Sequence, residues 1–559
     1  MSAAKACGAA AAVAAAIAVW LYFTPELRLR DELRAIQFWQ LEALLVLLVA
    51  VSIAGMRALL GSLAIARREL APPLASSLLA AVLVFAVAPG TNRIYYDEQI
   101  YQSIGQNMAD LRLAQMCSEG IVEYGVLQCA RGDYNKEPYG FPHLLSVAYR
   151  IVGVSPGAAH VLNGLSAIAL VWIIYLITVT LFGDRRSAAL ASLVAALIPA
   201  HLQWSHTAAS EPVSAAVAAW AVLALAAFLR RGSVSALLWT VVAASYAMQF
   251  RPEVALIFGV VVAGVILLGP QRRSLPGRMW WALSLTFVLC AVAVAHVIAI
   301  RHESWGSPGG GPLSLAYLWS NLQVNGPFYF WDARFPSLVG VLAVVGAWAR
   351  RSRESLLIGL WFLSFFGIYL LFYAGSYNYG ADIRYSLLTY PPLMILAGVG
   401  AAAIAGWLER RTPFRGGPVI AAALLFQFTW YLPNVRAVGE EAWAARADVK
   451  YAELMVKQLP PNAIVLTHNP GMFQVWGVNA AQLSIAATEP DYVNVLMRRF
   501  AGGVFVHWNF WCNVSDPVQS EYCRETERRY DTEKISEYRE RDYRYALSRI
   551  VGVKAQPLK

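Results

Sequence analysis

Charged residues are scarce in this sequence. Asp, Glu, Lys and Arg make up 14% of its 559 residues, whereas hydrophobic residues make up 58%. Soluble domains contain about 25% charged residues, so this composition argues against an ordinary soluble enzyme. A disordered chain needs low hydrophobicity and high charge, and the same figures exclude it. The sequence therefore indicates an integral membrane protein.

Metal-binding motifs and internal repeats are also missing. The six cysteines include no CxxC spacing, and no histidine lies between the two members of either close cysteine pair. This pattern disfavours a zinc site. The sequence also lacks the internal repeat that marks many transporters.

The positive charges fall in short arginine clusters between long apolar runs. This is the positive-inside pattern of a polytopic membrane protein and not a surface for nucleic acid, which we do not expect as a partner. The clusters are Arg67-Arg68, Arg185-Arg186, Arg230-Arg231, Arg272-Arg273, Arg350-Arg351 with Arg353, and Arg410-Arg411. We place these clusters in the cytoplasm.

About thirteen apolar stretches approach the roughly 20 residues that a membrane-spanning helix needs. They are 7–23, 38–60, 73–90, 158–182, 187–204, 209–229, 234–249, 252–269, 279–300, 336–349, 355–374, 386–408 and 417–433. The first stretch lacks a small-residue cleavage site, so we interpret it as a membrane helix and not as a signal peptide. These spans predict a multi-pass protein of the inner (plasma) membrane, with a cytoplasmic N-terminus and a C-terminal tail outside.

The polar mass then lies outside the membrane, in loop 91–157, loop 301–335 and the tail. We expect a small α/β domain over 435–559. Its predicted elements are an amphipathic stretch 441–459, strands 463–467 and 503–507, and a charged helix from about 517. Two additional membrane helices (1–72) precede a membrane domain over 73–434, which includes the first outer loop.

Four cysteines form two close pairs on the predicted outer side. Cys117 and Cys129 share the first outer loop, and Cys512 and Cys523 share the tail. The oxidising outer compartment favours two local disulfides, and four free thiols are the alternative.

An acidic pair follows the apolar run that ends near residue 90. Asp97 and Glu98 begin a segment whose apolar residues recur at helical spacing, which predicts a helix along the membrane interface. This position allows a catalytic role, although acidic residues also favour helix starts simply as caps.

A second polar cluster closes the same loop. Lys136, Glu137 and His143 lie in a Pro- and Gly-containing turn before another amphipathic stretch. Lipid headgroup pairing by Lys136 and capping by His143 are the simpler alternatives. Further ionisable groups stand at other predicted outer turns, where an interfacial anchor or a structural ion pair is the alternative to function. These groups are His206, Glu211, Arg251 and Arg384.

Carboxylates beside Arg and Lys at the outer interface suit one kind of chemistry. A carboxylate can accept the proton of an attacking hydroxyl, and Arg or Lys can hold a phosphate as it leaves. The residues therefore indicate group transfer from a lipid-phosphate donor.

Three motifs resemble those of the GT-C glycosyltransferases. They are Tyr-Asp-Glu at residues 96–98, Lys-Glu-Pro-Tyr-Gly-Phe-Pro at 136–142, and Arg-Tyr-…-Pro-Pro-Leu at 384–393. The branch they resemble is family-39-like: protein O-mannosyltransferases, aminoarabinose transferase and lipopolysaccharide galacturonosyltransferases. The resemblance covers about 73–434. It implies the GT-C fold, a polyprenyl-phosphate sugar donor, transfer on the outer face and inversion at the anomeric carbon.

The resemblance also implies roles for particular residues. Asp97 would be the general base with Glu98 beside it, and Lys136 and Arg384 would contact the donor phosphate. We add Arg251 to the phosphate-binding group. We assign substrate binding to Tyr96, Glu137, His143, His206 and Glu211.

Several alternatives stay open at this point. The two extra N-terminal spans and the α/β tail depart from the family pattern, so the acceptor can be a lipid, a protein or a polysaccharide. A divalent metal could be shared by Asp97, Glu98 and Glu211, or Lys136 and Arg384 could neutralise the charge instead. The other candidate functions are a transporter or flippase of a lipid-linked glycan, and a polymerase or ligase using a diphosphate-linked donor.

Overall fold

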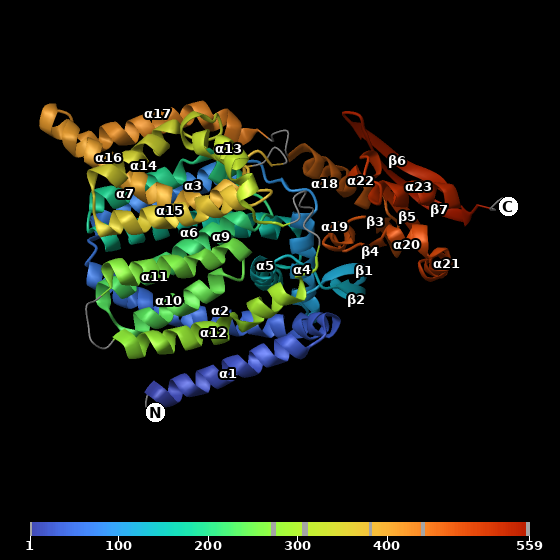
Figure 1. Cartoon of the computed structure of the whole chain (residues 1–559). Helices are drawn as coiled ribbons and strands as arrows, with labels where there is room; N and C mark the ends of the chain where they lie inside the picture. The colour runs from blue at the N-terminus through green and yellow to red at the C-terminus, as the bar shows by residue number, and fades with distance from the viewer. Residues whose placement is uncertain (1–2, 270–274, 304–310, 380–382, 438–441, 555–559) are drawn as a thin grey trace. The chain divides into compact units, whose positions relative to one another are not determined.

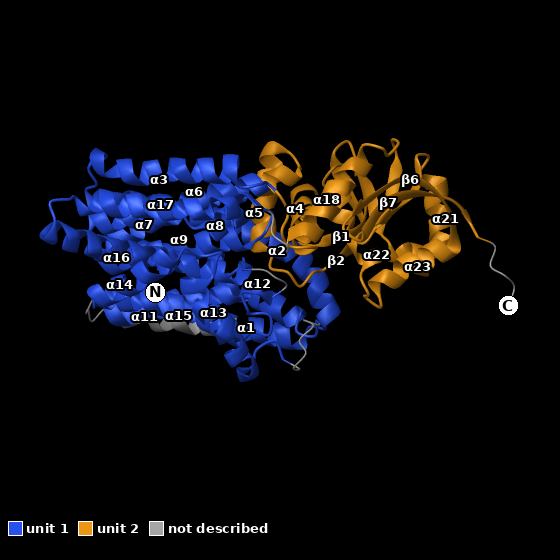
Figure 2. Cartoon of the chain, turned by 90° about the horizontal axis from the view of Figure 1, so that it is seen from above, with its two compact units in different colours: residues 1–90, 160–438 blue, residues 91–159, 439–559 orange. Residues whose placement is uncertain are grey.

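The computed structural model describes residues 3–269, 275–303, 311–379, 383–437 and 442–554. The predicted Arg272-Arg273 cluster and residue 441 of the predicted amphipathic stretch lie outside these ranges. The chain divides into two compact units, which Figure 2 colours separately. The first unit is Met1–Gly90 with His160–Val438, and the second is Thr91–Ala159 with Gly439–Lys559.

The first unit consists of helices (Figure 1). Its elements are α1 (Ala3–Phe23), α2 (Glu26–Leu63), η1 (Arg67–Leu70), α3 (Ala71–Val82), η2 (Leu83–Val87), α6 (Pro156–Phe182), α7 (Arg185–Ala196), α8 (Pro199–Trp204), α9 (Glu211–Arg231), α10 (Val234–Ala247), η3 (Pro252–Leu256), α11 (Ile257–Leu268), α12 (Leu275–Ala299), η4 (Leu315–Tyr317), α13 (Leu318–Trp331), α14 (Ser337–Ala349), α15 (Arg353–Leu371), η6 (Arg384–Thr389), α16 (Tyr390–Arg411) and α17 (Gly416–Arg436).

Among the described residues, 8 helices are long and apolar enough to cross a membrane, and three shorter apolar helices accompany them. The prediction of a polytopic helical membrane protein is therefore confirmed, whereas the count of thirteen spans is not. One predicted span, 187–204, is divided into α7 and α8. The division falls at Pro199, which begins α8 while Ile198 before it is extended (ψ 110°), as a residue preceding proline prefers.

Two further helical segments differ from the sequence prediction. Helix α2 begins at Glu26 and not near residue 38, because ion pairs one helical turn apart, such as Arg30 with Glu26, support its polar first turns. Helix α13 lies in the predicted outer loop 301–335, for which the sequence pattern predicts no helix.

Glycine allows helices α14, α16 and α7 to pack closely. A Cβ atom on Gly400 of α16 would overlap the carbonyl oxygen of Leu342 in α14, and one on Gly398 would overlap the backbone of Ala191 in α7. Small residues at such crossings are the usual means by which membrane helices approach each other.

The second unit is an α/β domain around a 7-stranded sheet of order β2-β1-β4-β3-β5-β7-β6. Its elements are α4 (Asp97–Leu111), β1 (Met116–Glu123), β2 (Val126–Asp133), α5 (Gly140–Val152), α18 (Trp443–Val456), β3 (Ala463–Thr467), α19 (Pro470–Gln474), β4 (Asn479–Gln482), α20 (Ser484–Thr488), α21 (Pro490–Arg499), β5 (Gly503–Trp508), α22 (Phe510–Asn513), α23 (Gln519–Arg529), β6 (Tyr530–Glu540) and β7 (Tyr543–Val553).

Strand β3 is at the centre of this sheet and runs parallel to β4 and β5. Its side chains alternate between two hydrophobic cores, as the pleat requires. Ile464 packs in the core that includes residues of α20, α21 and α23, whereas Val465 packs in the core that includes residues of α18 and α19. The predicted strands over 463–467 and 503–507 and the predicted helix within 441–459 are thus confirmed.

The first outer loop contributes two strands to this sheet. Hairpin β1–β2 adds to its edge, because Glu119 pairs with Ala481 of β4 and Gly120 with Ala480. Figure 1 shows β1 and β2 beside β4, although their colours mark distant parts of the sequence. The division predicted at 434/435, with the loop in the membrane domain, therefore differs from the division into units in the structure.

The C-terminal hairpin was also absent from the sequence prediction. The charged helix expected from about 517 is α23, but it ends at Arg529 and is followed by strands β6 and β7. These strands pair along most of their length and turn at Arg541, whose φ is 57°.

Alanine at Gly400 tests the close packing of α14 against α16. We expect Gly400→Ala to destabilise the protein by roughly 1–3 kcal/mol because the new methyl group overlaps a backbone carbonyl. Thermal unfolding in detergent, followed by tryptophan fluorescence, measures this loss. Gly406→Ala is the control in the same helix, since only the end of the Arg410 side chain lies nearby. Equal melting temperatures for the two variants would contradict the packing argument.

Candidate functional site

The acidic pair begins helix α4, as predicted, and its two carboxylates differ in environment. Asp97 is the first helical residue and is partly exposed. Glu98 is fully buried, and its Oε1 accepts hydrogen bonds from the backbone N–H groups of Arg93 (2.8 Å) and Ile94 (2.9 Å). Glu98 thus fixes the chain that leads into the helix. The more accessible carboxylate of the pair is that of Asp97.

The backbone just before Asp97 is strained. Tyr96 has φ 80° and ψ −54°, a positive-φ conformation that costs a residue with a Cβ roughly 1–3 kcal/mol. Hydrogen bonds on both sides of this peptide hold it in place. The Tyr95 hydroxyl donates to Asp448 Oδ2 (2.8 Å), and the Tyr96 side chain bonds with Gln482 at the end of β4. Strain of this kind clusters at functional sites.

The second polar cluster lies beside α4. The Tyr101 hydroxyl of α4 donates to Glu137 Oε2 (3.2 Å), and the Glu137 N–H donates to Asn135 Oδ1 (2.8 Å). Lys136 is partly exposed in this turn, whereas His143 is fully buried in the first turn of α5. The structure therefore brings the acidic motif and the Lys-Glu turn of the same loop together within the second unit.

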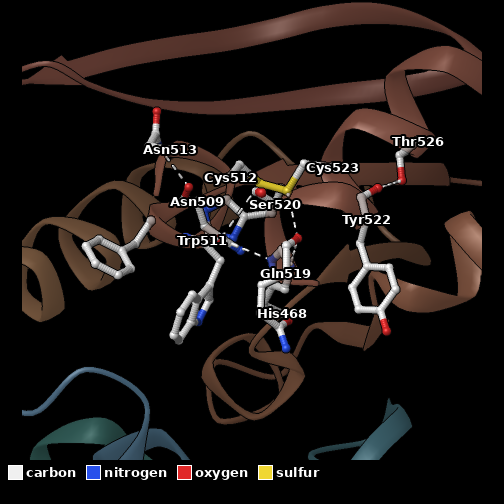
Figure 3. Close-up of a disulfide and its surroundings, with 12 residues drawn as sticks. His468, Asn509, Trp511, Cys512, Asn513, Gln519, Ser520, Tyr522, Cys523 and Thr526 are labelled. Atoms are coloured by element: carbon white, nitrogen blue, oxygen red, sulfur yellow. Dashed lines mark hydrogen bonds between the residues drawn. A yellow bond between two sulfur atoms is a disulfide. The ribbon is translucent and has the colours of Figure 1, made fainter. Parts of the chain in front are cut away.

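Both predicted cysteine pairs are disulfides. Cys117 and Cys129 join β1 to β2 with Cα atoms 5.7 Å apart, and Cys512 and Cys523 join α22 to α23 with Cα atoms 5.6 Å apart. Figure 3 shows His468 near the second bridge. Among the described residues, His468 and these two cysteines are the one group whose potential metal-ligand atoms gather closely, within 4.8 Å. Because the sulfurs are bonded to each other, the group offers no thiolate for a metal.

The first unit contains a cluster of charged residues at helix starts. Glu211 begins α9, Arg251 precedes η3, and Arg384 begins η6. Arg251 bridges two carboxylates: Nη1 lies 2.5 Å from Glu211 Oε1, and Nε lies 2.5 Å from Glu253 Oε1. Arg384 Nη1 lies 3.9 Å from Glu211 Oε1. Three of the predicted site residues thus meet in the structure.

This cluster is nearly inaccessible to water. The side chains of Glu211 and Arg251 are 1% and 13% exposed. Buried charges need pairing and hydrogen bonds to offset their desolvation, and Tyr369 supplies one hydrogen bond to Glu253 Oε1 (2.7 Å). Among the described residues, Glu211 Oε2 has no hydrogen-bond partner. The arrangement can orient the two guanidinium groups toward an anion.

Sequence reasoning did not assign Glu253, Tyr369 or Tyr385 to the site. Tyr385 lies under the Arg384 guanidinium, 4.9 Å from ring centroid to Cζ, and 5.2 Å from the Tyr369 ring. The Arg-Pro-Glu sequence at 251–253 gave a signal for Glu253. Tyr385 directly follows Arg384 in the motif at 384–393. Tyr369 is distant from the arginines in sequence, and only the fold brings it to the cluster.

His206 has a different set of neighbours. Its Nδ1 lies 2.8 Å from the carbonyl oxygen of Ala88, and its ring lies 5.9 Å from that of His160. Asn163 Nδ2 donates to the carbonyl of Thr207 (2.7 Å) in the adjacent turn. These contacts fix the turn that leads to α9, so His206 stabilises that turn. Contact between His206 and the substrate stays a prediction.

The predicted site residues are divided between the two units. In the second unit are Tyr96, Asp97, Glu98, Lys136, Glu137 and His143, and in the first are His206, Glu211, Arg251 and Arg384. A single site formed by both sets, or a cation shared by Asp97, Glu98 and Glu211, therefore stays a prediction.

Asp448 was absent from the sequence-based assignment. It is fully buried in α18, where it accepts hydrogen bonds from the Tyr95 hydroxyl (2.8 Å) and the Phe510 N–H (3.2 Å). Burial raises the pKa of the Asp448 carboxyl to about 7, although both hydrogen bonds favour its charged form. A single carboxylate in an amphipathic helix is typical of a solvated face, so the burial of Asp448 cannot be recognised from the sequence pattern.

Comparisons with known proteins agree with this architecture. Residues 136–298, less than a third of the chain, match the family model described as dolichyl-phosphate-mannose-protein mannosyltransferase. No curated protein sequence matches the chain.

Solved structures share the fold at low sequence identity. ArnT from Cupriavidus metallidurans bound to undecaprenyl phosphate has a TM-score of 0.55 and 16% identity, covering 85% of this chain and 97% of that one. The apo oligosaccharyltransferase from Archaeoglobus fulgidus has a TM-score of 0.51 and 12% identity, covering 83% and 73%. The chain has the GT-C fold. The family match and this fold together support the predicted membership of the GT-C superfamily.

The pKa of Asp448 predicts a pH-dependent stability. A carboxyl that titrates near 7 when folded and near 4 when unfolded destabilises the fold above pH 7, by about 4 kcal/mol, and this penalty disappears as the pH falls toward 4. Asp448→Asn removes the charge, so we expect it to melt above the wild type at pH 8.5 and to lose this advantage near pH 4.5. Thermal unfolding at both pH values measures the difference. Asp491→Asn on exposed Asp491 is the control; the same pH trend in both variants would contradict the assignment.

Proposed function

We propose that this protein is a membrane glycosyltransferase that transfers a sugar from a polyprenyl-phosphate donor to an acceptor hydroxyl at the outer face of the inner membrane. The observation that carries the proposal is Asp97, a partly exposed carboxylate at the start of a helix, held by a strained peptide in a chain with the GT-C fold. The acceptor hydroxyl belongs to a lipid, a protein or a polysaccharide.

The proposed reaction is a single displacement. The acceptor oxygen forms a bond to the anomeric carbon while the bond from that carbon to the phosphate oxygen breaks, and the phosphate leaves with the electron pair. Asp97 accepts the proton of the acceptor hydroxyl as general base. Attack opposite the leaving phosphate inverts the anomeric configuration.

The leaving phosphate needs positive charge nearby. Arg251 and Arg384 are the proposed ligands in the first unit and Lys136 in the second. A carboxylate-paired arginine is pre-oriented and can share its remaining donors with a phosphate oxygen. The likeness to ArnT bound to undecaprenyl phosphate supports a lipid-phosphate donor.

A second candidate is transfer of a preassembled glycan from a diphosphate-linked carrier. The likeness of the fold to an oligosaccharyltransferase supports this second candidate. Donor preference separates the two candidates. A transporter or flippase is the third candidate, and it would bind donors without consuming them.

Replacement of the proposed base tests the mechanism. We expect Asp97→Asn to lower turnover of the preferred polyprenyl-monophosphate sugar by about 10²–10⁴-fold, with donor binding retained. The assay measures release of polyprenyl phosphate by purified protein across a panel of monophosphate and diphosphate donors. Asp110→Asn is a matched control on α4, because the Asp110 carboxylate has a structural contact: it accepts a hydrogen bond from the Leu127 N–H of β2. Equal loss in both variants would remove Asp97 from the reaction, and consumption of diphosphate donors alone would favour the second candidate.

Neutralising Arg384 tests the phosphate site. Loss of a charge-assisted hydrogen bond should weaken donor binding by about 10–100-fold, so Arg384→Gln should raise the KM for the donor. Arg334→Gln is the control, since Arg334 pairs with Asp332 elsewhere in the same unit. Saturation kinetics measure both variants, and an unchanged KM for Arg384→Gln would exclude Arg384 from the phosphate site.

A further inference from the structure

The carboxyl ends of β3 and β5 lie where an α/β sheet ordinarily receives a ligand. The chain passes from β3 to β4 on one side and then crosses to β5 on the other. This change of direction creates a topological switch point between β3 and β5, and ligands of α/β sheets bind outside the strand ends at such a point. Asn469 and Asn509 follow these two strand ends.

In this protein the chain itself occupies the switch point. The Tyr95 ring lies 4.6 Å from that of Phe510 and 5.5 Å from that of Trp511, both just after β5. Its hydroxyl donates to Asp448 Oδ2 and accepts from Asn469 Nδ2 (3.4 Å), just after β3. Tyr95 thus fills the position that a ligand would take, and it stands two residues before Asp97.

Helix α4 is also fixed along its length. A Cβ on Gly471 of α19 would clash with the Ser103 side chain, so the two backbones are in close contact. The Ser103 hydroxyl accepts the Cys117 N–H (3.2 Å), and Gln106 Nε2 donates to the Gln474 carbonyl (3.4 Å). The segment after α4 is held by the pairing of β1 with β4. The first turn of α4 therefore lies between two anchors on one sheet.

We propose that the C-terminal α/β domain positions the catalytic base, with Tyr95 and Asp448 as the pair of positioning residues. This inference rests on the proposed function. The Tyr95–Asp448 hydrogen bond and the Tyr96–Gln482 hydrogen bond hold the strained, positive-φ backbone at Tyr96, and this backbone sets the direction in which α4 begins. Without that hold the strained peptide relaxes, and the Asp97 carboxylate moves away from the acceptor hydroxyl.

The ionisable neighbours of Asp448 are tyrosines. Tyr95 faces it from the segment before α4 and Tyr545 from β7, while α22 contributes the Phe510 N–H. Burial raises the pKa of both tyrosines above the usual tyrosine value of about 10, so these two neighbours stay protonated while Asp448 titrates near pH 7. As a carboxylate it makes a charge-assisted bond with the Tyr95 hydroxyl, which is stronger than the bond made by the neutral acid.

Three variants of the full-length protein test this proposal. Tyr95→Phe removes the hydroxyl, and Asp448→Asn keeps the size and polarity of the side chain but cannot ionise. Tyr492→Phe is the matched control, because the Tyr492 hydroxyl donates to a carboxylate oxygen of Glu119 (2.6 Å) in the same unit without touching the segment before α4.

The kinetic readout separates positioning from binding. We expect Tyr95→Phe to lower kcat by roughly 10–100-fold, since small displacements of a catalytic group have effects of that size, with the donor KM within about threefold. The wild-type kcat should rise through a step near pH 7, and Asp448→Asn should lack this step. Tyr492→Phe should change neither kcat nor the pH profile by more than about twofold.

Hydrogen–deuterium exchange of the peptide over residues 93–103 gives a readout that does not depend on activity. We expect faster exchange there in Tyr95→Phe and no change in Tyr492→Phe. Equal kcat, pH profile and exchange in Tyr95→Phe and Tyr492→Phe would overturn the positioning proposal. If Tyr95→Phe does not fold, a retained pH step in Asp448→Asn overturns it instead. Absence of donor turnover by the wild type would overturn the proposed function, and the exchange result alone would then decide whether the domain holds α4.

Discussion

Backbone pairing between β1 and β4 is the interaction on which the second unit depends. Glu119 and Gly120 pair with Ala481 and Ala480, and the Val122 N–H donates to the Asn479 side chain across 357 residues of sequence. A strand edge carries N–H and C=O groups that need partners, and here the two segments supply them to each other. The loop that follows the third apolar helix thereby becomes part of the C-terminal domain, and α4 between Tyr95 and the hairpin receives a fixed position.

Local patterns predicted the parts of the fold that depend on local physics. The start of α4 at Asp97, the strand over 463–467 and the long apolar helices have strong periodicity or hydrophobicity, so the sequence located them. The addition of hairpin β1–β2 to the sheet of the C-terminal domain could not be predicted, because β4, which pairs with β1, is distant in sequence. Helix α13 was missed because Pro327 and the polar residues around it are typical of a loop.

In the candidate site too, local sequence predicted some features, and contacts between distant residues determine the others. The rule that charged residues in a membrane protein mark functional sites identified Glu211, Arg251 and Arg384, and the structure places them in contact. The sequence could not predict which carboxylate pairs with which arginine, nor that Arg251 bridges Glu211 and Glu253. The role of Asp448 could not be predicted from the sequence for a further reason. That role depends on complete burial of the Asp448 carboxyl, and the burial depends on packing by β7 and α22.

The Cys117–Cys129 disulfide bears on how the protein is made. A ribosome completes the β1–β2 hairpin early, whereas β4 appears only after all the helices of the first unit have been synthesised. During that interval the edge of β1 that β4 will cover is unpaired, and such an edge is prone to pairing with other chains. A covalent link between the two strands keeps the hairpin in register until β4 has been synthesised. The disulfide therefore stabilises the hairpin during synthesis as well as in the finished fold, because it keeps the edge of β1 in the conformation that later pairs with β4.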